Sequence, residues 1–365
     1  MAEKSTYILN MGPQHPSTHG VLQVELELSG ERIERAKPIL GYLHRGIEKL
    51  MESRTYAQCL PYTDKLDYVS SMNNNLAWCT AVEKLAGIRV PLRAEYLRVI
   101  AAELNRIASH LVFIGTLLND LGAATAFVYA FRDREKVLDL FDLICGARMS
   151  TSYIRLGGVA FDATEEFIEK TQAFLDYVPE MLEEYDHLIT GNEIFYARMK
   201  GVSPMTAEEA KALSLSGANL RATGVAYDIR RVEPYSVYDR LDFEVPVGTL
   251  GDDWDRYEVR LKEIGESAKI IRQALKEMPE GSCRKVVSPN IRPPKGSVYC
   301  RVENTRGELG FYIVSDGTAK PYRVHIRRPS FVNLQALDPL CRGTLVADSV
   351  VVYSTLDPLM GEVDC

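Results

Sequence analysis

Three stretches of the sequence repeat apolar residues at the spacing of an amphipathic helix, and they constrain the fold more than any other feature. Between residues 97 and 118, apolar residues recur in alternating steps of three and four, and the same happens between 257 and 278. This spacing predicts one long helix in each stretch, with an apolar stripe on one face. Residues 161–188 form the third such stretch, with Asp162 as the predicted N-cap of its helix and Glu165 three residues later. Because such stripes pack against one another, we predict a central helical bundle.

Shorter elements surround the predicted bundle. Alternating apolar residues with a Ser-Gly turn predict a β-hairpin over 21–37. Residues 64–85 are predicted to be helical, and Thr206 and Glu209 form a capping box for a short helix. After a Pro- and Gly-rich linker at 279–294, three strands are predicted, at 298–302, 311–314 and 322–326. The apolar run 346–356 fits a strand or a buried helix, since a short run does not distinguish them.

These elements predict an α+β protein that is mainly helical. We expect three regions, namely an N-terminal α+β region with the hairpin (1–63), the helical bundle (64–279) and a C-terminal β/α region packed on the bundle (280–365). The stretch 111–131 is apolar and long enough to span a bilayer. However, Asn119 and Asp120 lie near its centre, where an acidic side chain is costly in lipid. We therefore interpret it as a core helix followed by a buried turn.

Composition excludes several classes of function. The formal charge is −7 and no basic stripe interleaved with aromatic residues is present, which argues against nucleic-acid binding. The seven cysteines are scattered without a CxxC pair, so this chain is not expected to build a zinc or iron–sulfur site. An odd, scattered set fits reduced thiols in the cytoplasm better than disulfides. The N-terminal residues show no signal-peptide core.

A Pro- and Gly-bounded loop near the N-terminus holds two of the six histidines, His15 and His19, immediately before the predicted hairpin. Two prolines and two glycines restrict the backbone, so the loop can hold a polar side chain in one place. Imidazole is well suited to moving protons near neutral pH. From spacing alone, an incidental surface turn is an equally good interpretation.

Longer motifs carry a resemblance that covers nearly the whole chain in order. They read GPQHPSTHGVLQVELELSGE at the N-terminus, then HRGIEKLMESRTYAQ, RIASHLVFIGTLLNDLGA, YIRLGGVAFD, LRATGVAYDIRR, ENTRGELGFYIVSDG, PSFVNLQAL and LDPLMGEVD. In these blocks the sequence resembles the quinone-binding core subunit of respiratory complex I, the NADH:quinone oxidoreductase family. The chain itself contains no GxGxxG motif, and no nucleotide site is expected in it.

The resemblance implies a quinone-reduction site with Tyr68 and His19 as ligands of the quinone headgroup and Asp120 as the partner of the histidine. These residue types suit the chemistry, because a phenol donates a hydrogen bond at neutral pH and a carboxylate raises the basicity of an imidazole. Without the resemblance, we would interpret Tyr68 as a core aromatic residue, Asp120 as a helix C-terminal cap and His19 as a turn residue. The implied walls of the site are Thr18, Met149 and Val363.

The family in turn resembles the large subunit of nickel–iron hydrogenases, which holds its metals with two cysteine pairs. At the corresponding positions this chain has Asp67 and Ser70 in the first motif and Leu359 and Glu362 in the second. A site for soft metals cannot form without its thiolates, so we expect no metal in this chain. The fold implied is the hydrogenase large-subunit type, with its cavity available for another ligand.

Three positions depart from the family. Many relatives have Arg at position 65 and His at position 150, both close to the terminal [4Fe–4S] cluster of a partner subunit, whereas this chain has Lys65 and Ser150. Relatives usually end in Arg, and this chain ends in Cys365. Because Ser150 cannot titrate, we expect a cluster of lower potential, suited to a low-potential quinone such as menaquinone.

The implied function is the quinone-reducing subunit of a complex I-like enzyme. Electrons would arrive from the [4Fe–4S] cluster of an iron–sulfur partner subunit, among other peripheral-arm subunits, and membrane-arm subunits would translocate protons. Those partners would hold the chain at the cytoplasmic face of the cell inner membrane. The first electron donor stays open among NADH, ferredoxin and a reduced flavin coenzyme. A hydrogenase large subunit is disfavoured by the missing cysteines, and a non-catalytic scaffold subunit of a hydrogenase-like complex is the remaining alternative.

Overall fold

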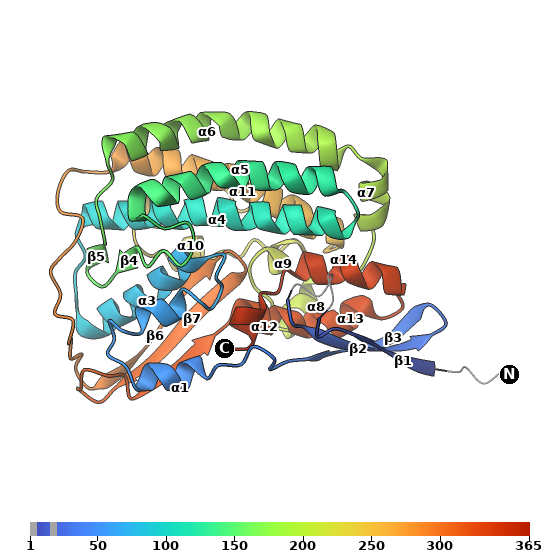
Figure 1. Cartoon of the computed structure of the whole chain (residues 1–365), viewed down its shortest axis with the longest axis horizontal. Coiled ribbons are helices and arrows are strands. Elements are labelled where there is room, and N and C mark those ends of the chain that lie inside the picture. Colours follow the sequence, from blue (N-terminus) through green and yellow to red (C-terminus); the bar gives the residue numbers. More distant parts are fainter. Residues whose placement is uncertain (1–5, 15–19) are drawn as a thin grey trace.

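The computed structural model describes residues 6–14 and 20–365, and four long helices form a bundle at the top of the view in Figure 1, with α11 behind the other three. Two of them, α4 and α11, carry the heptad-like stripes found in the sequence, and their apolar residues are buried. This confirms the predicted helical bundle. The four helices are α4 (Leu92–Asp120), α5 (Ala124–Cys145), α6 (Glu165–Tyr185) and α11 (Asp253–Glu277).

The apolar stretch 111–131 begins in a core helix, as predicted, but the turn that follows is partly exposed and not buried, and a second, antiparallel helix completes the stretch. Helix α4 ends at Asp120, residues 121–123 turn the chain, and α5 starts at Ala124. None of the helices in residues 6–14 and 20–365 combines the length and the hydropathy that a bilayer-spanning helix needs.

Below the helical layer, an antiparallel sheet packs against helix α3 (Ser71–Ala86) and completes the larger core (Figure 1). The ring of Trp78 on α3 meets Phe311 of the sheet edge-on, with centroids 5.4 Å apart. The three predicted C-terminal strands are thereby confirmed. They are β6 (Gly296–Asn304), β7 (Gly307–Ser315) and β8 (Arg323–Arg327).

A second, smaller core lies beneath a separate three-stranded sheet. The predicted hairpin is present as β2 (Gln23–Ser29) and β3 (Arg32–Ile39), and β1 (Thr6–Met11) adds an edge strand that the sequence analysis missed. Residues 346–356 form helix α14 (Val346–Leu356), which decides between the two interpretations of that run. The sheet packs on α13 (Leu337–Cys341), and the second core also includes residues of α14 and α15 (Met360–Val363).

Two predicted helix starts were wrong. Helix α6 is capped by Thr164, whose hydroxyl accepts a hydrogen bond from the Phe167 amide at 3.1 Å, while Asp162 pairs with Arg93 at 2.9 Å. Helix α3 begins at Ser71 and not at residue 64, because residues 64–70 form turns. The capping box at Thr206 is confirmed.

The remaining elements are short and connect these layers. The predicted division of the chain into three regions, with boundaries at residues 63 and 279, stays a prediction. The helices are α1 (Ile47–Glu52), α2 (Leu60–Thr63), α7 (Glu193–Met199), α8 (Ala207–Ala212), α9 (Ala218–Arg221), α10 (Ile229–Val232) and α12 (Pro329–Asn333), with a π-helical turn (Asp186–Thr190), two 3-10 turns (Tyr238–Arg240, Leu334–Ala336) and the strands β4 (Ile154–Arg155) and β5 (Gly158–Val159).

Candidate functional site

A pocket of about 250 Å³ brings together residues from four separate parts of the chain, one of them Arg306 in the turn between β6 and β7. The turn before α3, the C-terminal end of α4 and the segment between α14 and α15 each contribute to its wall. Two of the predicted site residues, Tyr68 and Asp120, face this same pocket. The lining residues are Tyr68, Val69, Val112, Thr116, Asn119, Asp120, Arg306, Asp357, Pro358 and Leu359.

Tyr68 is presented by a turn whose backbone is fixed by buried side chains. The Asp67 carboxylate accepts a hydrogen bond from the Val69 amide at 3.1 Å. Asn74 and Asn105 donate to the carbonyl oxygens of Asp67 and Val69, each at 2.8 Å. Because the flanking carbonyls are held in this way, the phenol of Tyr68 stays at the protein surface with 41% of the residue exposed. The core-aromatic interpretation of Tyr68 is therefore wrong.

A buried guanidinium lies beside Tyr68 in the pocket wall. Arg306, in the turn between β6 and β7, binds Asp67 at 2.7 Å through Nη1 and Asp357 at 2.9 Å through Nη2. Its Nε also donates to the Asp357 carbonyl oxygen at 3.0 Å. Asp357 adopts a left-handed backbone conformation (φ 53°) between α14 and α15. Arg306 therefore joins the Tyr68 turn to the C-terminal segment.

Asp120 is the last residue of α4 and lines the same pocket as Arg306. Its Oδ2 accepts a hydrogen bond of 2.5 Å from the Ser354 hydroxyl on α14. The carboxylate therefore also links the helical bundle to the second core.

Partial burial in the pocket wall affects the protonation of the Tyr68 phenol. It raises the pKa of Tyr68 above its usual value, as does the nearby Asp67 carboxylate, although the Arg306 guanidinium acts in the opposite direction. The phenol thus keeps its proton at neutral pH and can donate a hydrogen bond into the pocket. With the apolar side chains of Val69, Val112 and Leu359 around it, this donor suits a planar ligand that carries a carbonyl oxygen.

The other predicted site residues lie elsewhere or outside the described residues. His19 and Thr18 lie outside the described residues. Val363 is buried in the second core, with 2% of its surface exposed. Met149 and Ser150 follow the C-terminal end of α5 and do not line the pocket, although the hydroxyl of the next residue, Thr151, lies 3.2 Å from that of Ser71 at the start of α3. Lys65 is exposed, and its carbonyl oxygen accepts a hydrogen bond from Arg45.

The sequence analysis missed Arg306 and Asp357 as site residues. Both stand in motifs that carried the family resemblance, ENTRGELG and LDPLMGEVD, but their pairing joins positions far apart in sequence. The sequence contained one indication of a site at Arg306, namely an arginine between two predicted strands. A solvent-exposed arginine in such a connection would look the same.

The four positions that correspond to hydrogenase ligands show no metal-binding arrangement. Asp67 is bound to Arg306, Ser70 donates to Asn304 at 2.6 Å, and Leu359 lines the pocket. In the described part of the chain, no group of three or more His, Cys, Asp or Glu side chains is arranged to hold a metal ion.

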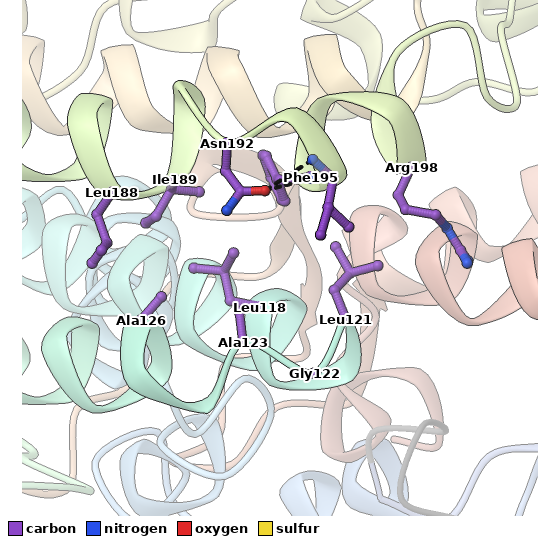
Figure 2. Close-up of a pocket in the computed structure, with 11 residues that line it drawn as sticks. Leu118, Leu121, Gly122, Ala123, Ala126, Leu188, Ile189, Asn192, Phe195 and Arg198 are labelled. Carbon is purple, nitrogen blue, oxygen red and sulfur yellow. Dashed lines mark hydrogen bonds between the residues drawn. The ribbon is translucent and has the colours of Figure 1, made fainter.

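A second pocket, of about 200 Å³, lies on the other side of the α4–α5 turn (Figure 2). Its wall is mostly apolar and includes Leu118, Leu121 and Phe195. The side chain of Asn192 points toward it but is used as the cap of α7, accepting from the amides of Ile194 and Phe195. With no acidic side chain, histidine or phenol in its wall, this pocket offers no proton donor for catalysis.

Comparison with known proteins gives one consistent result. Residues 120–287 and 283–365 match the family model of the respiratory-chain NADH dehydrogenase 49 Kd subunit. An NADH-quinone oxidoreductase subunit from Desulforamulus reducens is 54% identical over 98% of both chains. The subunits of the same name from Bacillus mycoides and Carboxydothermus hydrogenoformans are both 52% identical, over 100% and 98% of both chains respectively. The chain therefore belongs to this family.

Proposed function

We propose that this member of the 49 Kd subunit family forms the quinone-reduction site of a complex I-like NADH:quinone oxidoreductase. The observation that carries the proposal is the meeting of Tyr68 and Asp120 in one pocket, since the two come from segments far apart in the sequence. The Tyr68 phenol donates a hydrogen bond to one carbonyl oxygen of the quinone. His19 binds the headgroup as the second ligand, and Asp120 is its partner.

Reduction of a quinone to a quinol takes two electrons and two protons, so the site needs proton donors next to the ring. Tyr68 keeps its proton at neutral pH and supplies a donor at one oxygen. Arg306 lies in the same wall and stabilises negative charge that develops on the ring as electrons arrive. The family resemblance also assigns Thr18, Met149 and Val363 to a wider wall that meets the ring and its tail, although Met149 and Val363 do not line the pocket itself.

The fold of the chain is of the nickel–iron hydrogenase large-subunit type under this proposal, with the metal replaced by quinone. Electrons come from a [4Fe–4S] cluster in an iron–sulfur partner, near Lys65 and Ser150. Other peripheral-arm and membrane-arm subunits complete the enzyme, hold it at the cytoplasmic face of the inner membrane and couple reduction to proton translocation. Ser150 in place of a titratable imidazole favours menaquinone as the substrate.

Replacement of Tyr68 by Phe in the assembled complex tests the proposal. The lost hydrogen bond contributes about 1 kcal/mol to binding, whereas loss of a proton donor costs about 100-fold in rate. We expect reduction of a short-chain quinone to fall by about that factor, while electron entry, measured with an artificial acceptor, survives. Tyr312→Phe is the matched control, because Tyr312 has similar exposure on β7. Unchanged quinone turnover in Tyr68→Phe would refute the assignment and favour a scaffold role.

A further inference from the structure

Close to the pocket lies one buried carboxyl group that has no cation partner among the described residues. Glu362, in α15, is fully buried and accepts one hydrogen bond, from the Ser330 amide to Oε2 at 3.0 Å. In the described residues its Oε1 has no hydrogen-bond partner and no ion pair involves the side chain. An ionised carboxylate in such surroundings is costly, since a single amide does not replace the water that burial removes.

The charges around Glu362 point the same way. Arg306 is shared between Asp67 and Asp357, and Arg260 lies 4.0 Å from Asp357. Three carboxyl groups therefore lie near two guanidinium groups, and both guanidinium groups are engaged by the two aspartates. With both aspartates ionised, the set is neutral when Glu362 carries a proton.

The groups that face Glu362 come from each element packed against α15. Asp67 and Arg306 come from the Tyr68 turn and the β6–β7 turn, and Ser330 comes from α12. The Cys365 thiol lies on the C-terminal side, together with Arg328, which donates to its carbonyl oxygen. Burial raises the pKa of Glu362 to about 7, and the Asp67 carboxylate adds to this, while Ser330 and Arg306 partly oppose it.

The segment that holds Glu362 touches the Tyr68 turn directly. A Cβ placed on the preceding Gly361 would lie 2.8 Å from the Leu66 carbonyl oxygen and 3.3 Å from Cδ1 of Tyr68. Glu362 therefore lies behind the wall of the pocket, next to its proposed proton donor, without lining the pocket itself.

We propose that Glu362 holds the proton that keeps the set of Asp67, Asp357, Arg306, Arg260 and Glu362 neutral, and that loss of this proton at alkaline pH slows quinone reduction. Ionised Glu362 places an uncompensated negative charge behind Tyr68. That charge opposes both the arrival of electrons on the quinone and proton donation by the phenol. At about 10 Å inside a protein, a unit charge changes a charge-forming step about tenfold. Glu362 is thus a positioning residue that acts through Asp67 and Arg306. The inference rests on the proposed quinone site.

The test is the pH profile of quinone reduction by the assembled complex carrying Glu362→Gln, which has the same shape and cannot ionise. Between about pH 6 and pH 8, wild-type kcat/KM for a short-chain quinone should fall several-fold, and the variant should lose most of that fall. Glu180→Gln, at an exposed position on α6, is the control and should follow the wild type. A Glu362→Gln profile that superimposes on the wild-type profile overturns the inference.

A second readout does not depend on turnover. In the infrared difference spectrum between the two pH values, a protonated carboxyl band of the wild type should disappear. This change should be absent in Glu362→Gln. A further outcome is that Tyr68→Phe leaves turnover intact while the carboxyl band still disappears in the wild type and not in Glu362→Gln. In that case the quinone assignment fails and the proton assignment stands.

If Glu362→Gln does not assemble, Asp67→Asn serves instead. Removing that neighbouring carboxylate lowers the pKa of Glu362, so the alkaline fall in kcat/KM should move to lower pH. An unmoved fall overturns the inference.

Discussion

Gly361→Ala tests whether close packing of the C-terminal segment positions Tyr68. Gly361 has ordinary helical geometry, so the alanine itself is compatible with the backbone and gains about 0.5–1 kcal/mol of helix propensity. Its Cβ, however, would lie 2.8 Å from the Leu66 carbonyl oxygen and 3.3 Å from Cδ1 of Tyr68. Both of these groups belong to the turn that carries the phenol.

The magnitude follows from that distance. Carbon and oxygen atoms in comparable contacts lie about 3.3–3.6 Å apart, so the turn and α15 must separate by about 0.5 Å or more. Overpacking of this kind costs about 1–3 kcal/mol, which exceeds the gain in helix propensity. Since a displacement of about 1 Å can cost about 100-fold in rate, we expect quinone reduction to fall about tenfold.

The assay compares quinone reduction with electron entry to an artificial acceptor in the same assembled complex. Gly265→Ala on α11 is the matched control, because a Cβ there meets only Leu182 Cδ1 at an ordinary 3.6 Å. Loss of quinone reduction with intact electron entry supports the reasoning. Equal quinone turnover in the two variants would show that the contact does not position Tyr68.

Three further predictions concern the ion cluster, metal content and the partner's cluster. Arg306→Met leaves Asp67 and Asp357 buried without their shared cation, which should destabilise the assembled complex by about 3–5 kcal/mol; an unchanged melting temperature would contradict this. Elemental analysis of the purified complex should find iron from partner clusters and no stoichiometric nickel, whereas one nickel per chain would exclude the proposed site. Ser150→His should raise the potential of the terminal [4Fe–4S] cluster and make it depend more steeply on pH in redox titrations, because a protonated imidazole stabilises the reduced cluster; no change would show that position 150 does not control it.

The long helices were predictable because their signal is local. The stripes of α4 and α11 repeat over many turns, so the period is unambiguous without knowledge of the partner helices. The start of α3 was not predictable in this way, since the turn before it is held by Asn74 and Asn105 through contacts that no periodicity encodes. Strand β1 was missed because most of its residues are exposed and the strand shows no clear burial alternation.

The pocket was only partly predictable, for a related reason. Tyr68 and Asp120 were named through the family resemblance and not through spacing, and both line the same pocket. Arg306 pairs with Asp67 across 239 residues, and a single sequence contains no signal for a contact at that separation. Glu362 was not predictable either. It stands out because its buried carboxyl group has no cation partner among the described residues, and only the three-dimensional packing reveals this.

If the proposed function holds, the ion cluster makes this pocket better suited to a quinone than to a metal cation. A cation that entered between Asp67 and Asp357 would have to displace the Arg306 guanidinium, which already binds both carboxylates. A neutral quinone leaves those bonds intact. As electrons reach the ring, negative charge grows beside a guanidinium that is fixed by its partners and needs no reorganisation, which is the arrangement that stabilises such charge most effectively. Through the same hydrogen bonds, Arg306 therefore disfavours binding of a metal cation and favours reduction of a quinone.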